Sequence, residues 1–135
     1  MPVPKRIFVV ADFKDEKPQS IHIERRHWTK GFVRLGHDVQ RFSYRNIMLQ
    51  FSPIKSQIFA RWFFKKQVDS ALAEQVKHYY PDIVIILGMK NLDRRTVDTL
   101  RIVAPKAIFI GRDTAAWPEN DAERIAIAKK MDIVI

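Results

Sequence analysis

Five short apolar runs recur along the chain and constrain its fold more than any other feature of the sequence. They are "RIFVVAD" (6–12), "HDVQRFSY" (37–44), "DIVIILG" (82–88), "KAIFIG" (106–111) and "DIVI" (132–135), all rich in β-branched and aromatic residues. Four of the five are nearly continuous in apolar character, which is typical of strands covered on both faces. The runs therefore predict the buried strands of a parallel sheet.

Segments with helical spacing separate these runs. Their expected apolar faces are Ile21/Trp28/Phe32/Leu35, Val68/Leu72/Val76/Tyr79, Val97/Leu100/Val103 and Ile125/Ala128. Alternation of strand and helix up to a fifth strand predicts an α/β domain of the Rossmann-like or flavodoxin-like kind. We expect an open, parallel five-stranded sheet of order 2-1-3-4-5 with helices on both faces.

The length of 135 residues suits one Rossmann-like domain covering residues 1–135. The chain has no cysteine, so a disulfide framework and a thiolate metal site are excluded and the cytoplasm is the expected compartment. The apolar run near the N-terminus is too short for a signal peptide core or a membrane span. Since the fifth expected strand ends with the last residue, we expect the chain to be a fragment or the first half of a larger protein.

Positive charge is concentrated in the first half of the sequence. Residues 1–66 hold 14 Lys and Arg against 5 Asp and Glu, whereas residues 67–135 hold 10 of each. No acidic residue lies between Asp38 and Asp69, a stretch that contains six cations. Such asymmetry favours an anionic partner on one face of the protein.

Several kinds of chemistry are excluded by the loops that follow the expected strands. The loop from Asp12 to Ser20 contains no glycine, so the dinucleotide fingerprint is missing, and no P-loop run occurs anywhere in the chain. The third strand ends in Gly88 and Met89, where a receiver domain would need an aspartate. The four histidines lack the spacing of a metal site. We therefore predict neither a cofactor nor a metal ion.

The remaining interpretation is that loop side chains recognise a ligand. These loops follow the carboxyl ends of the strands, where ligands bind in open parallel sheets. The predicted substrate-binding residues are Asp12, Phe13, Gly88, Met89, Arg112, Asp113 and Trp117. Arg112 could meet a phosphate or carboxylate and Asp113 sugar hydroxyls, although the two could equally form an ion pair. Asp12 could bind a hydroxyl or cap the next helix, and Trp117 could stack on a ligand or pack in a turn.

Several segments together resemble the N-terminal domain of glycosyltransferases built from two facing Rossmann-like domains, the GT-B type. They are "KRIFVVADF", "GFVRLGHDVQRFSYR", "HYYPDIVIILG", "GRDTAAWPEND" and "KKMDIVI". Within this type the chain resembles the spore-maturation-type glycosyltransferases, in which "LGH-x-V" opens the second strand and "PDIV" the third. Gly36, His37 and Val39 match the first motif in this sequence, and residues 81–84 match the second. The resemblance covers nearly all of the chain, but its motifs are structural turns.

The resemblance implies transfer of a sugar from a nucleotide-sugar donor to an acceptor, usually without a bound metal. The acceptor would bind mainly to this domain, along residues 12–22, 88–91 and 112–117, and a second, C-terminal domain would hold the donor. Without that domain we expect the chain to be inactive. Asp12, His22 and Asp113 are candidates for the catalytic base by position only. The alternative is a stand-alone flavodoxin-like binding or interaction domain without catalysis.

The stretch "SPIKSQIFARWFFKKQ" (52–67) combines four aromatics with four cations and no acid. A loop containing Met48, Leu49, Phe51 and Ile54 could cover its aromatics. Alternatively, Arg61, Trp62, Lys65 and Lys66 could form a surface for an anionic membrane, which suits a lipid-linked acceptor and peripheral membrane association, or for a protein partner. Nucleic acid is disfavoured because no recognisable nucleic-acid module accompanies the stretch.

Overall fold

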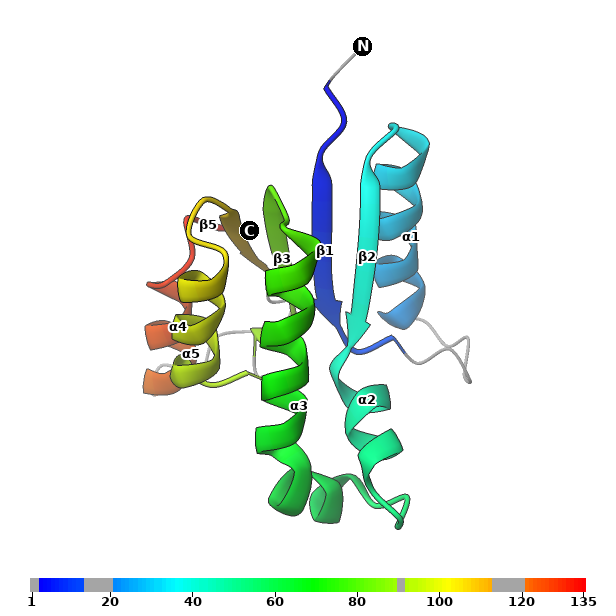
Figure 1. Cartoon of the computed structure of the whole chain (residues 1–135), viewed down its shortest axis with the longest axis vertical. Helices are drawn as coiled ribbons and strands as arrows, with labels where there is room; N and C mark the ends of the chain where they lie inside the picture. The colour runs from blue at the N-terminus through cyan, green and yellow to red at the C-terminus, as the bar shows by residue number, and fades with distance from the viewer. Residues whose placement is uncertain (1–2, 14–20, 90–91, 113–120) are drawn as a thin grey trace.

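The computed structural model of the chain describes residues 3–13, 21–89, 92–112 and 121–135, with the side chains of 21–25 and 57 outside that description. The elements are β1 (Arg6–Ala11), α1 (Ile21–Arg34), β2 (Asp38–Ser43), α2 (Tyr44–Phe51), α3 (Gln57–Tyr79), β3 (Ile83–Leu87), α4 (Arg94–Val103), β4 (Ile108–Arg112), α5 (Ala122–Ala128) and β5 (Ile133–Val134). All five strands are parallel, in the order β2-β1-β3-β4-β5 (Figure 1). The predicted fold class and strand order are confirmed.

Strand β1 lies at the centre of the topology because it pairs with both β2 and β3. Val10 stands opposite Phe42 on one side and opposite Ile86 on the other. Strand order reverses at this point, since the chain first moves outward to β2 and then returns past β1 to β3. In open parallel sheets the crevice beyond the carboxyl ends of two such strands is the usual ligand site.

Apolar side chains from alternate strand positions form a core on each face of the sheet. On one face Phe8, Val10 and Phe109 pack with helices α2 to α5. On the other face Val9 and Ile85 pack with Phe32 of α1. The strands thus bury both of their faces, which explains the nearly continuous apolar runs in their sequences.

The sequence-based prediction of a loop around residues 48–54 is wrong over its first part, because helix α2 extends to Phe51. The chain leaves β2 at Ser43 and turns directly into the helix, with Tyr44 and Met48 one turn apart on its buried side. Apolar residues at this spacing give the segment a stripe that a helix can bury, and α2 packs against α3. Strand β2 accordingly ends at Ser43, one residue before the predicted end of the second strand at Tyr44.

Helix α3 follows its predicted stripe but outruns the sheet. Val68, Leu72 and Val76, spaced by four residues, are completely buried as predicted. Its 23 residues span roughly 34 Å at 1.5 Å each, whereas the six residues of β1 span roughly 20 Å. Figure 1 shows the surplus: the first turns of α3, together with α2, extend past the carboxyl ends of β1 and β2.

Aspartates preceding two strands tie neighbouring strands together at the amino edge of the sheet. Asp82, before β3, accepts a hydrogen bond from the backbone N–H of Arg6 at 2.8 Å. Asp132, before β5, accepts one from the backbone N–H of Phe109 at 2.8 Å. The "PDIV" and "MDIV" segments therefore encode strand entry, since their carboxylates satisfy N–H groups that begin the adjacent strand.

Gly31 in α1 and Gly36 just beyond it provide a matched test of how this helix ends. Gly36 has φ +85° just beyond the helix, where an added Cβ would meet no atom, so Gly36→Ala costs only backbone strain, about 1 kcal/mol. Gly31 lies inside the helix with equal space around it, so Gly31→Ala should stabilise the protein by about 0.5–1 kcal/mol. Urea unfolding of both variants measures the two changes, and equal signs would contradict this account of the helix end.

Candidate functional site

The carboxyl ends of β1, β3 and β4 lie side by side and form the described part of a rim. Leu87 stands opposite Arg112 in the sheet, and the N–H of Gly88 donates to the carbonyl of Arg112 at 2.9 Å. Val10 and Ile86 are paired nearby, so Asp12 follows at the same edge. The structure thus brings together the predicted residues Asp12, Gly88 and Arg112.

Asp12 serves as a helix cap at this rim. Its Oδ1 accepts a hydrogen bond at 3.1 Å from the backbone N–H of Arg45, in the first turn of α2. Ser43 occupies the N-cap position of α2 but makes no side-chain capping bond, so the carboxylate of Asp12 supplies it from a neighbouring strand. The capping alternative is therefore the one that the geometry favours, with α2 as the helix instead of the one that follows Asp12 in sequence.

Phe13 and Met89 are core residues. Phe13 is buried in the core on the α1 side of the sheet, with the guanidinium of Arg41 5.2 Å from its ring centroid. Met89 has no exposed surface and packs closely over Gly111, where an added Cβ would lie 2.8 Å from the Met89 sulfur. Their side chains hold the rim in shape and offer no surface to a ligand.

Arg112 extends from the end of β4 toward α1, where its guanidinium lies 5.1 Å from the centroid of the Trp28 ring. Trp28 in turn contacts Phe32 edge-on at 5.8 Å. Arg112 and Trp28 are both half-buried, so a cation and an aromatic face meet at the rim. Sequence reasoning assigned Trp28 only to the apolar face of its helix, and no spacing signal links it to Arg112.

Three predicted residues cannot be placed as side chains. The backbone of His22 belongs to the first turn of α1, but its side chain is outside the described part of the structure. Asp113 and Trp117 lie outside the described residues altogether. The candidate catalytic base therefore stays a sequence-based prediction.

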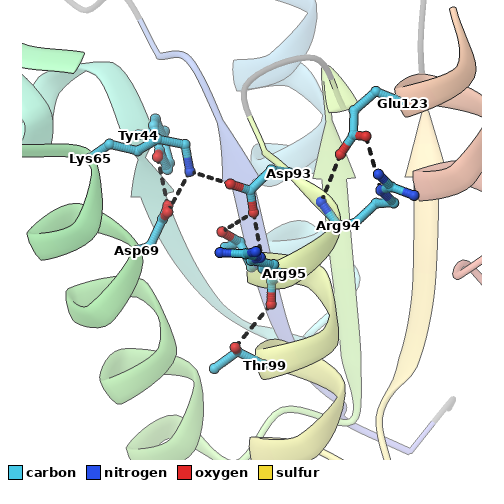
Figure 2. A network of polar contacts seen from close by, with 9 residues as sticks. Tyr44, Lys65, Asp69, Asp93, Arg94, Arg95, Thr99 and Glu123 are labelled. Carbon is cyan, nitrogen blue, oxygen red and sulfur yellow. Dashed lines mark hydrogen bonds and ion pairs between the residues drawn. The ribbon is translucent and has the colours of Figure 1, made fainter. Parts of the chain in front are cut away.

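A polar network links α2, α3 and α4 on the face of the sheet opposite to α1 (Figure 2). The ammonium of Lys65 lies 2.5 Å from Asp69 Oδ2 and 2.8 Å from Asp93 Oδ2. Tyr44 donates its hydroxyl hydrogen to Asp69 Oδ1 at 2.6 Å. Asp93 also caps α4, since its Oδ1 accepts from both the N–H and the hydroxyl of Thr96 at 2.8 Å. Lys65 thus connects α3 to the start of α4, and the bond from Tyr44 to Asp69 connects α2 to the same network.

Burial and charge shift the protonation equilibria of this network. Burial alone would raise the pKa of Asp93, but the bonds from Lys65 and Thr96 outweigh it and lower the pKa to about 2. Burial likewise opposes the charge of Lys65, yet the two carboxylates raise its pKa above the usual value. Burial and the bond to Asp69 raise the pKa of Tyr44 well above its ordinary range. The network therefore keeps its charges at neutral pH and acts as a brace.

Two of the grooves lined by described residues lie on opposite faces of the sheet. The first, of about 820 Å³, runs between α3 and α4 past the brace and reaches Trp62 at one end. The second, of about 660 Å³, lies between α1 and β2 and carries the cations Arg26, Lys30, Arg34 and Arg41 with no acidic residue in its described lining. Sequence reasoning missed this basic groove, although Arg26, Lys30 and Arg34 recur every four residues on one helix.

The residues predicted to form a membrane or partner surface divide into two groups. Lys65 belongs to the brace and is only 26% exposed. Arg61, Trp62 and Lys66 are exposed. Of the four aromatics that the packing interpretation expected to be hidden, Phe59 and Phe64 are half-buried, whereas Trp62 and Phe63 are exposed. Trp62 is one of five exposed large apolar residues at the end of α2, in the connection to α3 and in the first turns of α3. These five, called here the apolar tip, are Phe51, Ile54, Ile58, Trp62 and Phe63.

No protein-family model matches the chain, and neither a curated protein nor a solved structure matches it significantly. Within the described part of the chain, no three His, Asp or Glu side chains are grouped so that they could hold a metal ion. None of the described helices combines the length and apolar character needed to cross a bilayer.

The brace generates a prediction about pH. Asn retains the capping oxygen at position 93 but removes the charge, so Asp93→Asn should lower the free energy of unfolding by about 1 kcal/mol at pH 7, after allowance for solvent screening. The pKa of Asp93 is lower in the folded protein than the usual 3.8. Its contribution is thus present above about pH 4, and the difference between the two proteins should vanish as the pH falls toward 2.

Urea unfolding between pH 7 and pH 2 measures this difference. Asp98→Asn is the matched control, because Asp98 pairs with Lys130 on the surface and is 51% exposed. That change should cost less than about 0.5 kcal/mol. A loss for Asp93→Asn that does not depend on pH would contradict the assignment of the charge to the brace.

Proposed function

We propose that this chain is the acceptor-side, N-terminal Rossmann-like domain of a two-domain GT-B glycosyltransferase similar to the spore-maturation type. Such an enzyme transfers a sugar from a nucleotide-sugar donor to an acceptor hydroxyl, and a second domain holds the donor. The observation that carries the proposal is the parallel sheet of order 2-1-3-4-5, whose switch point between β1 and β3 opens on the rim that contains Arg112. We further propose that the protein works in the cytoplasm.

The described rim side chains support acceptor binding in two ways. The guanidinium of Arg112 offers planar hydrogen-bond donors for a phosphate, a carboxylate or sugar hydroxyls. The Trp28 ring beside it offers an aromatic face, which packs on the apolar side of a sugar ring. A lipid-linked saccharide with a phosphate near its sugar would engage both groups.

The proposed division of work between two domains agrees with the chemistry of the first loop. Residues 12–20 contain no glycine, so their backbone cannot approach a pyrophosphate as closely as a glycine-rich loop does. A donor nucleotide would therefore be held mainly from the opposite side of the crevice. In the transfer itself, the acceptor oxygen bonds to the anomeric carbon, the nucleoside diphosphate leaves, and Asp12, His22 or Asp113 takes the acceptor proton.

A stand-alone flavodoxin-like binding domain without catalysis is the second candidate. The engagement of Asp12 as a cap and the burial of Phe13 and Met89 favour it, because three of the predicted ligand-binding side chains already have structural roles. The two candidates differ in what should bind at the rim.

Amide NMR of the ¹⁵N-labelled chain, titrated with saccharides, sugar phosphates and nucleotide sugars, tests the proposal. We expect saccharides or sugar phosphates to shift the resonances of Gly88, Arg112 and the Trp28 indole. Arg112→Ala should weaken that binding by about tenfold, since loss of a hydrogen bond to a charged group costs about 1.5–3 kcal/mol.

Arg34→Ala is the control. It removes the same charge as Arg112→Ala, but from the last turn of α1, at the edge of the sheet opposite to the rim. If none of these compounds moves the rim resonances, the glycosyltransferase proposal fails and the binding-domain candidate stands. If Arg34→Ala weakens binding as much as Arg112→Ala, the ligand lies in the basic groove and the rim assignment is wrong.

A further inference from the structure

We propose that the apolar tip and the cations beside it dock the protein on an anionic lipid surface. The inference goes beyond sugar transfer and does not depend on it, because the tip would bind lipid even if the chain transferred no sugar. It rests on three features of the described residues, namely where the tip lies, how its helix faces are divided and what charges surround it.

The tip lies where the molecule projects. The first turns of α3 and the connection from α2 extend past the carboxyl ends of β1 and β2 (Figure 1). Every side chain of the tip is at least 46% exposed, and Trp62 reaches 83%. A projecting end can enter the headgroup layer of a membrane without any rearrangement of the fold.

The division of faces along α3 leaves this apolar surface uncovered. The buried stripe passes through Ala60, Val68 and Leu72 at multiples of four residues. Ile58, Trp62 and Lys66, also four residues apart, form the opposite ridge. Further along the helix the outward positions are polar, as at Ser70 and Glu74. The outward apolar surface is thus confined to the first turns, beyond the end of the sheet, where core packing gives no reason for it.

The positive charges near the tip favour an anionic lipid surface as its binding partner. Lys55, Arg61 and Lys66 lie close to the tip residues in the chain, are exposed, and form no ion pair within the described part of the chain. No acidic residue occurs from position 39 to 68. Interfacial helices combine Trp, Phe and aliphatic side chains with flanking cations, which is the pattern found here. Ile54 and Ile58 would add nothing to base stacking but partition readily into lipid, so a membrane is favoured over single-stranded nucleic acid.

The location of the tip has a consequence for the rim. Both lie toward the carboxyl ends of the strands, so a membrane that holds the tip would lie on the same side as the rim (Figure 1). An acceptor attached to lipid would then meet the domain from that side. Membrane docking would supply the acceptor at a high local concentration.

Co-sedimentation of the chain with vesicles tests the proposal. We expect binding to vesicles that contain phosphatidylglycerol and little binding to phosphatidylcholine alone. Arg61→Glu/Lys66→Glu should reduce the partition coefficient at least about tenfold, because each surface cation contributes to attraction by anionic lipid. Ile58→Ala/Trp62→Ala should reduce it by a similar factor, because the buried apolar area is lost. Lys65 is left unchanged because its replacement would break the brace.

Matched controls come from elsewhere on the surface. Ile102→Ala removes an isoleucine that is 76% exposed on α4, against 78% for Ile58, and should leave binding unchanged. Lys30→Glu/Arg34→Glu makes the same charge change in the basic groove and should reduce binding by less than about threefold, since its cations lie away from the tip. Circular dichroism of each variant checks that the fold is intact.

Fluorescence locates the contact independently. Brominated lipids should quench the tryptophan emission of the wild-type chain. Trp62→Phe keeps an aromatic ring, so it should still bind vesicles while most of the quenching is lost. Retained quenching in Trp62→Phe would show that another part of the surface enters the membrane, which overturns the proposal.

Other occupants of the tip give different results. Absence of binding to anionic vesicles overturns the proposal. So does a loss of binding in the basic-groove variant that equals the loss in the tip variant. A dimer in sedimentation velocity that Trp62→Ala dissolves, without vesicle binding, would assign the tip to a second copy of the chain. None of these outcomes bears on saccharide binding at the rim, so failure here is distinguishable from failure of the proposed function.

Discussion

Burial of β1 between two parallel neighbours is the constraint on which the rest of the structure depends. Its residues Phe8 and Val9 are completely buried on opposite faces of the sheet, so each face needs its own layer of helices. A parallel neighbour on each side also forces both crossovers to start at the same edge. The switch point, the rim and the paired core layers all follow from the position of this one strand.

Several rim residues that the sequence analysis assigned to ligand binding have structural roles instead. Asp12 is polar and follows a strand, as a ligand-binding residue would, but it caps α2. Met89 closes the core over Gly111. The pair formed by Arg112 and Trp28 is different, because a half-buried cation on an aromatic face at the crevice is not needed to close either core cluster. This pair is therefore the part of the described rim that most favours a binding role.

The brace and the apolar tip divide one basic stretch into two functions. Lys65 and Lys66 are adjacent in sequence, yet a rotation of about 100° per residue separates them on the helix. Lys65 turns toward Asp69 and Asp93 and connects α3 to α4, whereas Lys66 lies in line with Trp62 on the outward ridge. The length of α3 makes this division possible, because the brace anchors the helix near the sheet while its first turns continue beyond it.

The sequence by itself determined the fold class, the strand order and the buried stripes of α3 and α4, because the pattern of apolar runs and helical spacing is local and few topologies accommodate it. The stripes expected for α1 and α5 are wrong at Leu35 and Ile125, which are exposed, and Ile127 is the buried residue of α5. Expected strand limits agree with the structure within two residues. Only the tertiary structure decided which polar groups meet. Asp12 contacts Arg45, Lys65 contacts Asp93 and Arg112 contacts Trp28, all across separations of 28 to 84 positions. Such contacts depend on the packing of whole elements, which leaves no periodic trace in the chain.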